Sequence, residues 1–243
     1  MKPLIGTLER ASDAPQSSPK INVTFAPSVA FAPDVVHSAQ TAAAPASAAR
    51  TATLAAISEL RTRHPDAAVV IAGTSPRPGR IRDAVVADIA ATLAQLLATT
   101  GGDYWLSNRD ADLRSRDMWY LLDHLHSPRL GLWIDVETLI ARGETPSVFL
   151  KQLAQFARAV VLRFAKVAPI VDGADDANVS RTIEILKGLG YRGLIVIDDV
   201  PPDDAGRALA ARLVQRLQDL WDRPVVVLAA YKGDKNAPKF VAR

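Results

Sequence analysis

The sequence contains no cysteine and only four histidines among its 243 residues. Without cysteine the chain can have no disulfide, thiol nucleophile, iron–sulfur cluster or thiolate-based zinc site. Long apolar runs are also missing, because none reaches the roughly 18 residues that a membrane span needs. Residues 1–20 lack the apolar centre of a signal peptide. The net charge of +3 is spread along the chain, which does not favour nucleic acid as a partner. We therefore expect a cytoplasmic protein with no membrane and no nucleic-acid partner.

The composition indicates a folded chain with two regions that differ in their amino-acid content. Hydrophobic residues make up 49% of the sequence and charged residues 23%, which favours a sizeable core over intrinsic disorder. Residues 1–50 form an Ala/Pro-rich N-terminal segment in which we predict one or two short strands, at 3–8 and 21–25. In residues 51–243, amphipathic helical stretches alternate with short apolar runs, which is the pattern of βα repeats around a parallel sheet.

The apolar runs and the helical stretches between them predict the fold class. The predicted strands are 67–72, 103–106, 130–134, 159–164, 193–197 and 224–229. Helices are predicted at 51–63, 83–98 and 115–125, and three more begin at Pro146, near Ser180 and at Asp203. Strand ends are about 30 residues apart, as in an eight-unit barrel of roughly 250 residues. No glycine-rich phosphate motif follows a strand, which disfavours a doubly wound sheet. We predict an α/β (β/α)8 TIM-like barrel, irregular and shortened at the N-terminus, with 224–229 as an extra C-terminal strand.

Two segments carry motifs that point to a family. One is Leu130-Gly-Leu-Trp-Ile-Asp-Val-Glu-Thr-Leu139, and the other is Thr182-Ile-Glu-Ile-Leu-Lys-Gly-Leu-Gly-Tyr-Arg-Gly-Leu-Ile-Val-Ile-Asp198. They resemble the "GLxxDxxH" and "LKxxGYxGxLxxE" segments of xylose-isomerase-like TIM barrels, the sugar phosphate isomerase and epimerase group, and the similarity runs from about residue 51 to 221. The resemblance implies a divalent metal held by Glu, Asp, His and Glu at four strand ends, which polarises the sugar oxygens while carboxylates move protons.

The resemblance, carried over position by position, implies an incomplete metal site. The family's four ligands fall on Ser107, Asp135, a position near Arg163, and Asp198, and a further His near the site falls on Thr138. A guanidinium cannot ligate a cation and repels one. If Arg163 points into the barrel mouth, we expect it to pair with Asp135 and Asp198 in place of the metal. We therefore expect no cofactor, or Mg²⁺ or Mn²⁺ with Asp135 and Asp198 as ligands if the protein is catalytically active.

Other side chains near predicted strand ends are candidates for binding a ligand. Arg77 and Arg80 follow the strand at 67–72 and are candidates for a phosphate or carboxylate, although a basic surface loop explains them more simply. The remaining ligand-binding candidates are Ser107, Asn108, Arg163 and Lys166. The loop 109–116 mixes charges of both signs and is predicted to be solvated. The tryptophans at 105 and 133 lie within strand runs, where barrel packing is the expected role.

Three hypotheses for function follow. The preferred one is a divergent sugar isomerase/epimerase-like barrel that has lost metal-dependent catalysis, a pseudoenzyme that binds a small polar or phosphorylated ligand (a sugar or a phosphate) or a protein partner. The second is an active sugar (phosphate) isomerase or epimerase in which Asp135 and Asp198 act as metal ligands or as acid and base, and Arg77 or Arg163 orients the substrate. The third is a scaffold subunit or homo-oligomer that associates through residues 1–50 or the strand 224–229. The sequence leaves open whether the protein is an enzyme.

Overall fold

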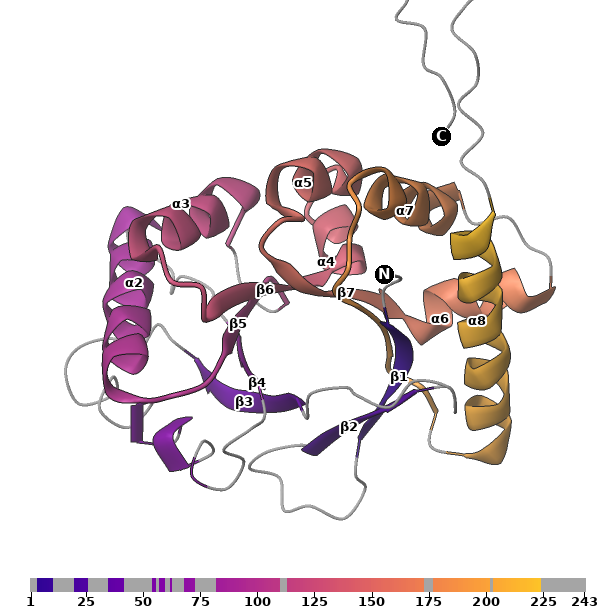
Figure 1. The fold of residues 1–243 in the computed structure, drawn as a ribbon, viewed down its shortest axis with the longest axis horizontal. Coiled ribbons are helices and arrows are strands. Elements are labelled where there is room, and N and C mark those ends of the chain that lie inside the picture. The colour runs from indigo at the N-terminus through magenta and orange to yellow at the C-terminus, as the bar shows by residue number, and fades with distance from the viewer. Residues whose placement is uncertain are drawn as a thin grey trace, which may run out of the picture.

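The computed structural model describes residues 4–10, 20–25, 35–41, 68–72, 82–109, 113–172, 177–201 and 203–223, with a few helical residues between 54 and 62. Eight strands close into a barrel in the order β1 to β8, and they form a ring in Figure 1. The strands are β1 Leu4–Arg10, β2 Lys20–Phe25, β3 Val35–Thr41, β4 Ala68–Ala72, β5 Tyr104–Ser107, β6 Leu130–Asp135, β7 Ala157–Arg163 and β8 Leu194–Asp198.

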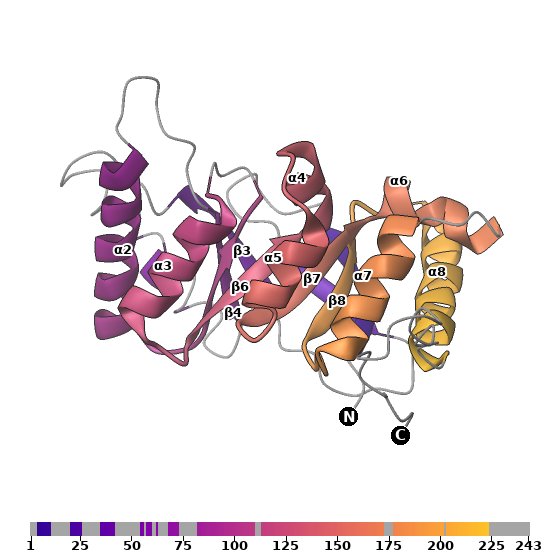
Figure 2. The ribbon, with the colours of Figure 1, turned by 90° about the horizontal axis from the view of Figure 1, so that it is seen from above.

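Helices lie outside the later strands of the barrel. They are α2 Arg82–Thr99, α3 Ser115–Leu125, α4 Val136–Ala141, α5 Pro146–Leu153, α6 Phe164–Val167, α7 Ala177–Gly188 and α8 Asp204–Asp222, with a 3₁₀ turn, η1, at Ala168–Asp172. The short helices α4 and α6 directly follow β6 and β7, and Figure 2 shows both at one end of the barrel. Among the residues that the structure describes, no helix is both long and apolar enough to cross a membrane.

The direction of β2 separates this barrel from a complete (β/α)8 barrel. Strands β3 to β8 and β1 pair in parallel around the ring. β2 runs antiparallel to both of its neighbours, β1 and β3. In a (β/α)8 barrel all eight strands are parallel and each is followed by a helix. The α/β barrel with an irregular N-terminal part is confirmed, whereas the complete (β/α)8 arrangement is not.

The N-terminal region contributes three strands to the barrel, where the sequence predicts at most two. The additional strand is β3, which pairs with β4 from Val35 to Thr41. The predicted C-terminal strand 224–229 and the candidates Arg77 and Arg80 lie outside the described residues.

Side chains of β4 to β8 alternate between two apolar cores, as continuously apolar strands predict. The larger core lies between the strands and the helices. The smaller one fills the barrel interior and consists of Ala68, Val70, Trp105, Trp133, Ala159, Val161, Leu194 and Val196. The two tryptophan rings stack there with centroids 6.2 Å apart, so their predicted packing role is confirmed. Because the side-chain period of a strand is two, the residues two positions further along β5 to β8 also face the interior. These are the strand-end residues Ser107, Asp135, Arg163 and Asp198.

Candidate functional site

Asp135 is the buried centre of the polar cluster at the carboxyl ends of the strands. It is the last residue of β6 and the N-cap of α4, and its exposed fraction is 0%. Its Oδ1 accepts a hydrogen bond from the Thr138 backbone N–H at 2.9 Å. Such a cap satisfies one of the free N–H groups at the start of a helix. Its Oδ2 faces the end of β7.

Arg163 fills the space beside Asp135. Its Nε and Nη2 donate to Asp135 Oδ2 at 3.1 and 3.0 Å. Nη2 also donates to Thr138 Oγ1 at 3.1 Å. Arg163 ends β7 on the interior face and its side chain is 34% exposed. Arg163 thus points into the barrel mouth, and the pairing with Asp135 that was expected for this orientation is present.

A second arginine, Arg109, joins the remaining carboxylates. Its Nη1 donates to Asp198 Oδ2, and its Nη2 donates to Asp199 Oδ2 at 3.0 Å. Its Nε lies 3.8 Å from Asp135 Oδ2. Burial disfavours the charged guanidinium, but the carboxylates of Asp198, Asp199 and Asp135 outweigh this effect and raise the pKa of Arg109. Arg109 therefore stays charged and links the ends of β6 and β8.

The turn after β8 brings Asp199 beside Asp198. Asp199 has a φ of 61°, in the left-handed region that Asp tolerates better than most residues. Its backbone N–H donates to Asp198 Oδ1 at 2.7 Å. This tight turn directs both carboxylates toward the single guanidinium of Arg109.

Ser107 and Asn108 hold the end of β5 in place. Asn108 is fully buried, and its Nδ2 donates to the Asp135 carbonyl at 2.9 Å while its Oδ1 accepts from the Asp135 N–H at 2.6 Å. Ser107 Oγ accepts from the Arg109 backbone N–H at 3.0 Å. Both side chains thus position the backbone that carries Asp135 and Arg109. Their predicted contact with a ligand stays a prediction.

The structure brings together five of the eight predicted site residues. Ser107, Asn108, Asp135, Arg163 and Asp198 converge at one end of the barrel. Lys166 lies on α6 with an exposed side chain.

Two members of the cluster, Arg109 and Asp199, were not predicted. The prediction that Arg109 belongs to a solvated loop is wrong, because its side chain is only 20% exposed and contacts three carboxylates. The one sequence signal for Arg109 is its position two residues after the end of β5, on the face where barrels carry their sites. The prediction that Arg163 also pairs with Asp198 was wrong in detail, since the arginine that bonds Asp198 is Arg109.

Comparisons with solved structures give the fold. The chain is similar to D-allulose 3-epimerase from Methylomonas sp. in complex with D-allulose, with 14% identity, a TM-score of 0.57 and coverage of 74% of this chain and 73% of the other. It is similar to D-psicose 3-epimerase with D-tagatose from Clostridium cellulolyticum H10, with 12% identity, a TM-score of 0.55 and coverage of 75% and 73%. For 3-keto-D-glucoside 4-epimerase from E. coli the identity is 16%, the TM-score 0.51 and the coverage 69% and 70%. The chain has the fold of the xylose-isomerase-like TIM barrels. In sequence, no family model and no curated protein matches it.

The strand ends of this barrel do not fit the metal that the sequence resemblance implies. A divalent cation of this kind needs several oxygen or nitrogen ligands around one point. Asp135 and Asp198 are the only carboxylates at the four carried-over positions, and each is bonded to an arginine. In the part of the chain that the structure describes, no group of three or more His, Asp or Glu side chains is placed to hold a metal ion. Two fixed positive charges stand beside the carboxylates instead.

Proposed function

We propose that this chain is a xylose-isomerase-like barrel that has lost metal-dependent catalysis and binds a neutral polar ligand of the sugar class at the Asp/Arg cluster. This cluster is defined as Arg109, Asp135, Arg163, Asp198 and Asp199. The observation that carries the proposal is that guanidinium–carboxylate pairs stand at the strand ends to which the resemblance assigns metal ligands.

Exposure within the Asp/Arg cluster supports binding through the arginines. The side chains of Asp135 and Asp198 are 0% and 1% exposed, whereas those of Arg163 and Arg109 are 34% and 20% exposed. Arg163 Nη1 has no acceptor among the described residues, and it is available to donate to a ligand. A ligand that approaches from solvent therefore meets N–H donors first, and the partly exposed Asp199 carboxylate can accept from a hydroxyl group.

The charge of the Asp/Arg cluster favours a sugar over a phosphorylated compound. Among the described residues of this cluster, three carboxylates face two guanidinium groups. A phosphate would add further negative charge beside these carboxylates, whereas sugar hydroxyl groups both donate and accept hydrogen bonds without a charge. Two of the similar solved structures contain a sugar, D-allulose in one and D-tagatose in the other.

The bonding of the two buried aspartates argues against their use as acid and base. Asp135 accepts from the Thr138 N–H on Oδ1 and from Arg163 on Oδ2. Asp198 accepts from the Asp199 N–H on Oδ1 and from Arg109 on Oδ2. A general base needs an oxygen within hydrogen-bond reach of the substrate proton. Here each oxygen is already occupied by a donor of the protein itself.

The test is a titration with D-allulose and with D-tagatose, followed by ligand-observed NMR in the presence of EDTA. We expect saturable binding that EDTA does not abolish, and no interconversion of the sugars with or without Mn²⁺. Arg163→Gln should weaken binding about tenfold, since it removes a charge-assisted donor. Arg181→Gln serves as the matched control, because Arg181 is exposed on α7 and its ion pair is with the exposed Glu184. Epimerisation that depends on Mn²⁺ would contradict the proposal.

The scaffold hypothesis stays a prediction. It depends on residues 1–50 and 224–229, of which the structure describes only the three strands β1, β2 and β3.

A further inference from the structure

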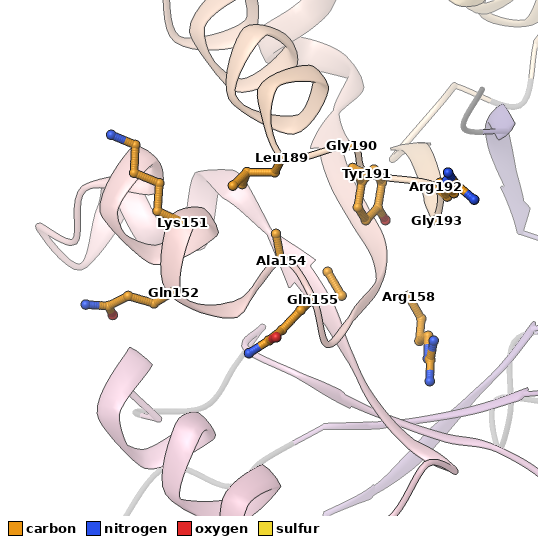
Figure 3. A pocket seen from close by; sticks show the side chains of 11 residues that line it. Lys151, Gln152, Ala154, Gln155, Arg158, Leu189, Gly190, Tyr191, Arg192 and Gly193 are labelled. Carbon is orange, nitrogen blue, oxygen red and sulfur yellow. The ribbon is translucent and has the colours of Figure 1, made fainter. Parts of the chain in front are cut away.

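A pocket of about 520 Å³ lies at the opposite end of the strands from the Asp/Arg cluster. It is formed where β7 and β8 begin, beside the carboxyl ends of α5 and α7 (Figure 3). Its volume is in the range of about 300–1,000 Å³ that is typical of small-molecule sites. The lining residues are Lys151, Gln152, Ala154, Gln155, Ala157, Arg158 and the run from Leu189 to Gly193. We call this cavity the basal pocket.

The charges around the basal pocket all have one sign. Lys151, Arg158 and Arg192 line it, and its described lining includes no aspartate or glutamate. None of these three cations forms an ion pair with a carboxylate of the described residues. Elsewhere in the described chain, arginines at 109, 163, 181, 207 and 212 each lie within 4.0 Å of a carboxylate. The basal pocket therefore holds positive charge that no carboxylate in the described part of the chain neutralises.

Arg158 is held in a fixed position at the wall of this pocket. Its aliphatic stem passes over Gly131, where an added Cβ would collide with Arg158 Cγ. Its Nη2 donates to the Pro128 carbonyl at 3.1 Å. These contacts hold one edge of the guanidinium, and the other nitrogens have no acceptor among the described residues. The site is thus partly preorganised, which reduces the ordering cost of binding.

The turn after α7 places Arg192 at the wall of the pocket, next to the buried Tyr191. Gly190 has a φ of 64°, which reverses the chain at the end of the helix. Tyr191 is then buried, and its hydroxyl donates to the Leu194 carbonyl at 2.8 Å. The adjacent Arg192 is exposed. Figure 3 shows Arg158 and Arg192 on one side of the pocket and Lys151 on the other, with Leu189 and Ala154 between them.

The helix ends oppose this positive charge only in part. The last carbonyl groups of α5 and α7 lie beside the pocket, and each helix end carries a partial negative charge of about half a unit. Lys151 and Lys187, in the last turns of α5 and α7, offset these partial charges. The two guanidinium groups remain in excess, so the pocket is positive overall.

We propose that the basal pocket binds a small phosphorylated molecule. Guanidinium groups match the oxygens of a phosphate in a two-pronged arrangement, and a lysine adds a point charge. Cations on two sides of the cavity suit a ligand with two phosphate groups or with one phosphate and a second anionic group. The amides of Gln152 and Gln155 can bond to hydroxyl groups of the same ligand. This site is separate from the Asp/Arg cluster, and its test does not depend on the proposed sugar ligand.

The experiment is a calorimetric titration of the full chain with inorganic pyrophosphate at low ionic strength, with citrate as a second anion. We expect saturable binding of one pyrophosphate, weaker binding of citrate, and loss of affinity in high salt. Arg192→Gln should weaken pyrophosphate binding about tenfold, and Lys151→Gln should weaken it by a similar or smaller factor. Both side chains are exposed, so neither change should disturb folding, which circular dichroism checks.

The matched control is Arg207→Gln. Arg207 lies in the first turns of α8 at the other end of the barrel, is half exposed and pairs with Asp204. Its replacement lowers the net charge by the same amount but should leave pyrophosphate affinity unchanged. Three results would overturn the proposal: no saturable binding of pyrophosphate, the same loss in Arg207→Gln as in Arg192→Gln, or citrate binding as tight as that of pyrophosphate.

Discussion

The contact between Asp135 and Arg163 makes a quantitative prediction about stability. Arg163→Met keeps the aliphatic stem but removes the charge that faces Asp135 Oδ2 at 3.0 Å. A fully buried carboxylate that loses its only partner destabilises a protein by about 3–5 kcal/mol. Here Arg163 is 34% exposed, and Arg109 Nε remains 3.8 Å from Asp135. Both facts reduce the effect, so we expect a loss of about 2 kcal/mol in the free energy of unfolding.

A double-mutant cycle separates this pair from general loss of packing. Asp135→Asn retains an oxygen for the Thr138 N–H but removes the charge, and Arg163 is exposed enough to be solvated. We expect the combined variant to be more stable than the sum of the single effects predicts, with a coupling energy of about 1–2 kcal/mol. Urea unfolding followed by circular dichroism measures each value.

An exposed ion pair supplies the control for the cycle. Arg181 and Glu184 on α7 are 67% and 58% exposed and lie 3.9 Å apart. The cycle of Arg181→Met with Glu184→Gln should give a coupling energy below about 0.5 kcal/mol. If the coupling energy of Asp135 and Arg163 is also below about 0.5 kcal/mol, the pair contributes no more than an exposed ion pair, which would contradict the prediction.

Three further predictions concern the packing, the titration and the caps of the same barrel. Gly193→Ala should destabilise by about 2 kcal/mol in the urea assay, because the new Cβ would lie 2.8 Å from the backbone oxygen of Arg158, while Gly101→Ala, with open space around it, should not. Burial raises the pKa of Tyr191, so the folded protein keeps the hydroxyl proton at a pH where the unfolded chain, with a pKa of about 10, has lost it. The contribution of Tyr191 to stability is therefore complete below about pH 10, and the free energy of unfolding should fall above it by about 1.4 kcal/mol per pH unit. Tyr191→Phe should remove this slope. Asp203→Ala removes the acceptor for the first turn of α8 and should lower the unfolding free energy by about 1 kcal/mol. The packing prediction would be wrong if both glycine variants lost the same stability. The titration prediction would be wrong if Tyr191→Phe kept the alkaline slope, and the cap prediction if Asp203→Ala were as stable as the unmodified chain.

The strands of the parallel part could be predicted because they are buried on both faces and therefore consist of consecutive apolar residues. The run 130–134 corresponds to β6 at Leu130–Asp135, and 103–106 to β5 at Tyr104–Ser107. β3 was missed, since Val35-Val-His-Ser-Ala-Gln-Thr41 has polar residues at most positions and lies in a low-complexity region. The antiparallel direction of β2 could not be predicted either, because strand direction depends on pairing with distant residues.

The site, too, has residues that the local sequence pattern could place and residues that depend on contacts between distant parts of the chain. The sequence reduced the direction of Arg163 to two possibilities, inward or outward, and its position two residues after the interior Val161 in β7 decides for inward. Arg109 lies beyond the end of β5, so the alternation of side chains along a strand does not determine its direction. Its direction depends on the bond from its N–H to Ser107 Oγ and on carboxylates that are 89 and 90 residues away in the chain. Contacts of this kind are visible only in the folded molecule.

The central proposal is that arginine–carboxylate pairs take the place of the metal site that the sequence resemblance implies, and the most direct test is the Mn²⁺ affinity of the purified protein. Calorimetry and elemental analysis would compare the unmodified chain with a restoration variant that carries Ser107→Glu, Arg109→Ala and Arg163→His. The account predicts no stoichiometric Mn²⁺ in the unmodified protein and a gain of binding in the variant, because two ligands are added and two positive charges are removed. Stoichiometric Mn²⁺ binding by the unmodified chain would contradict it.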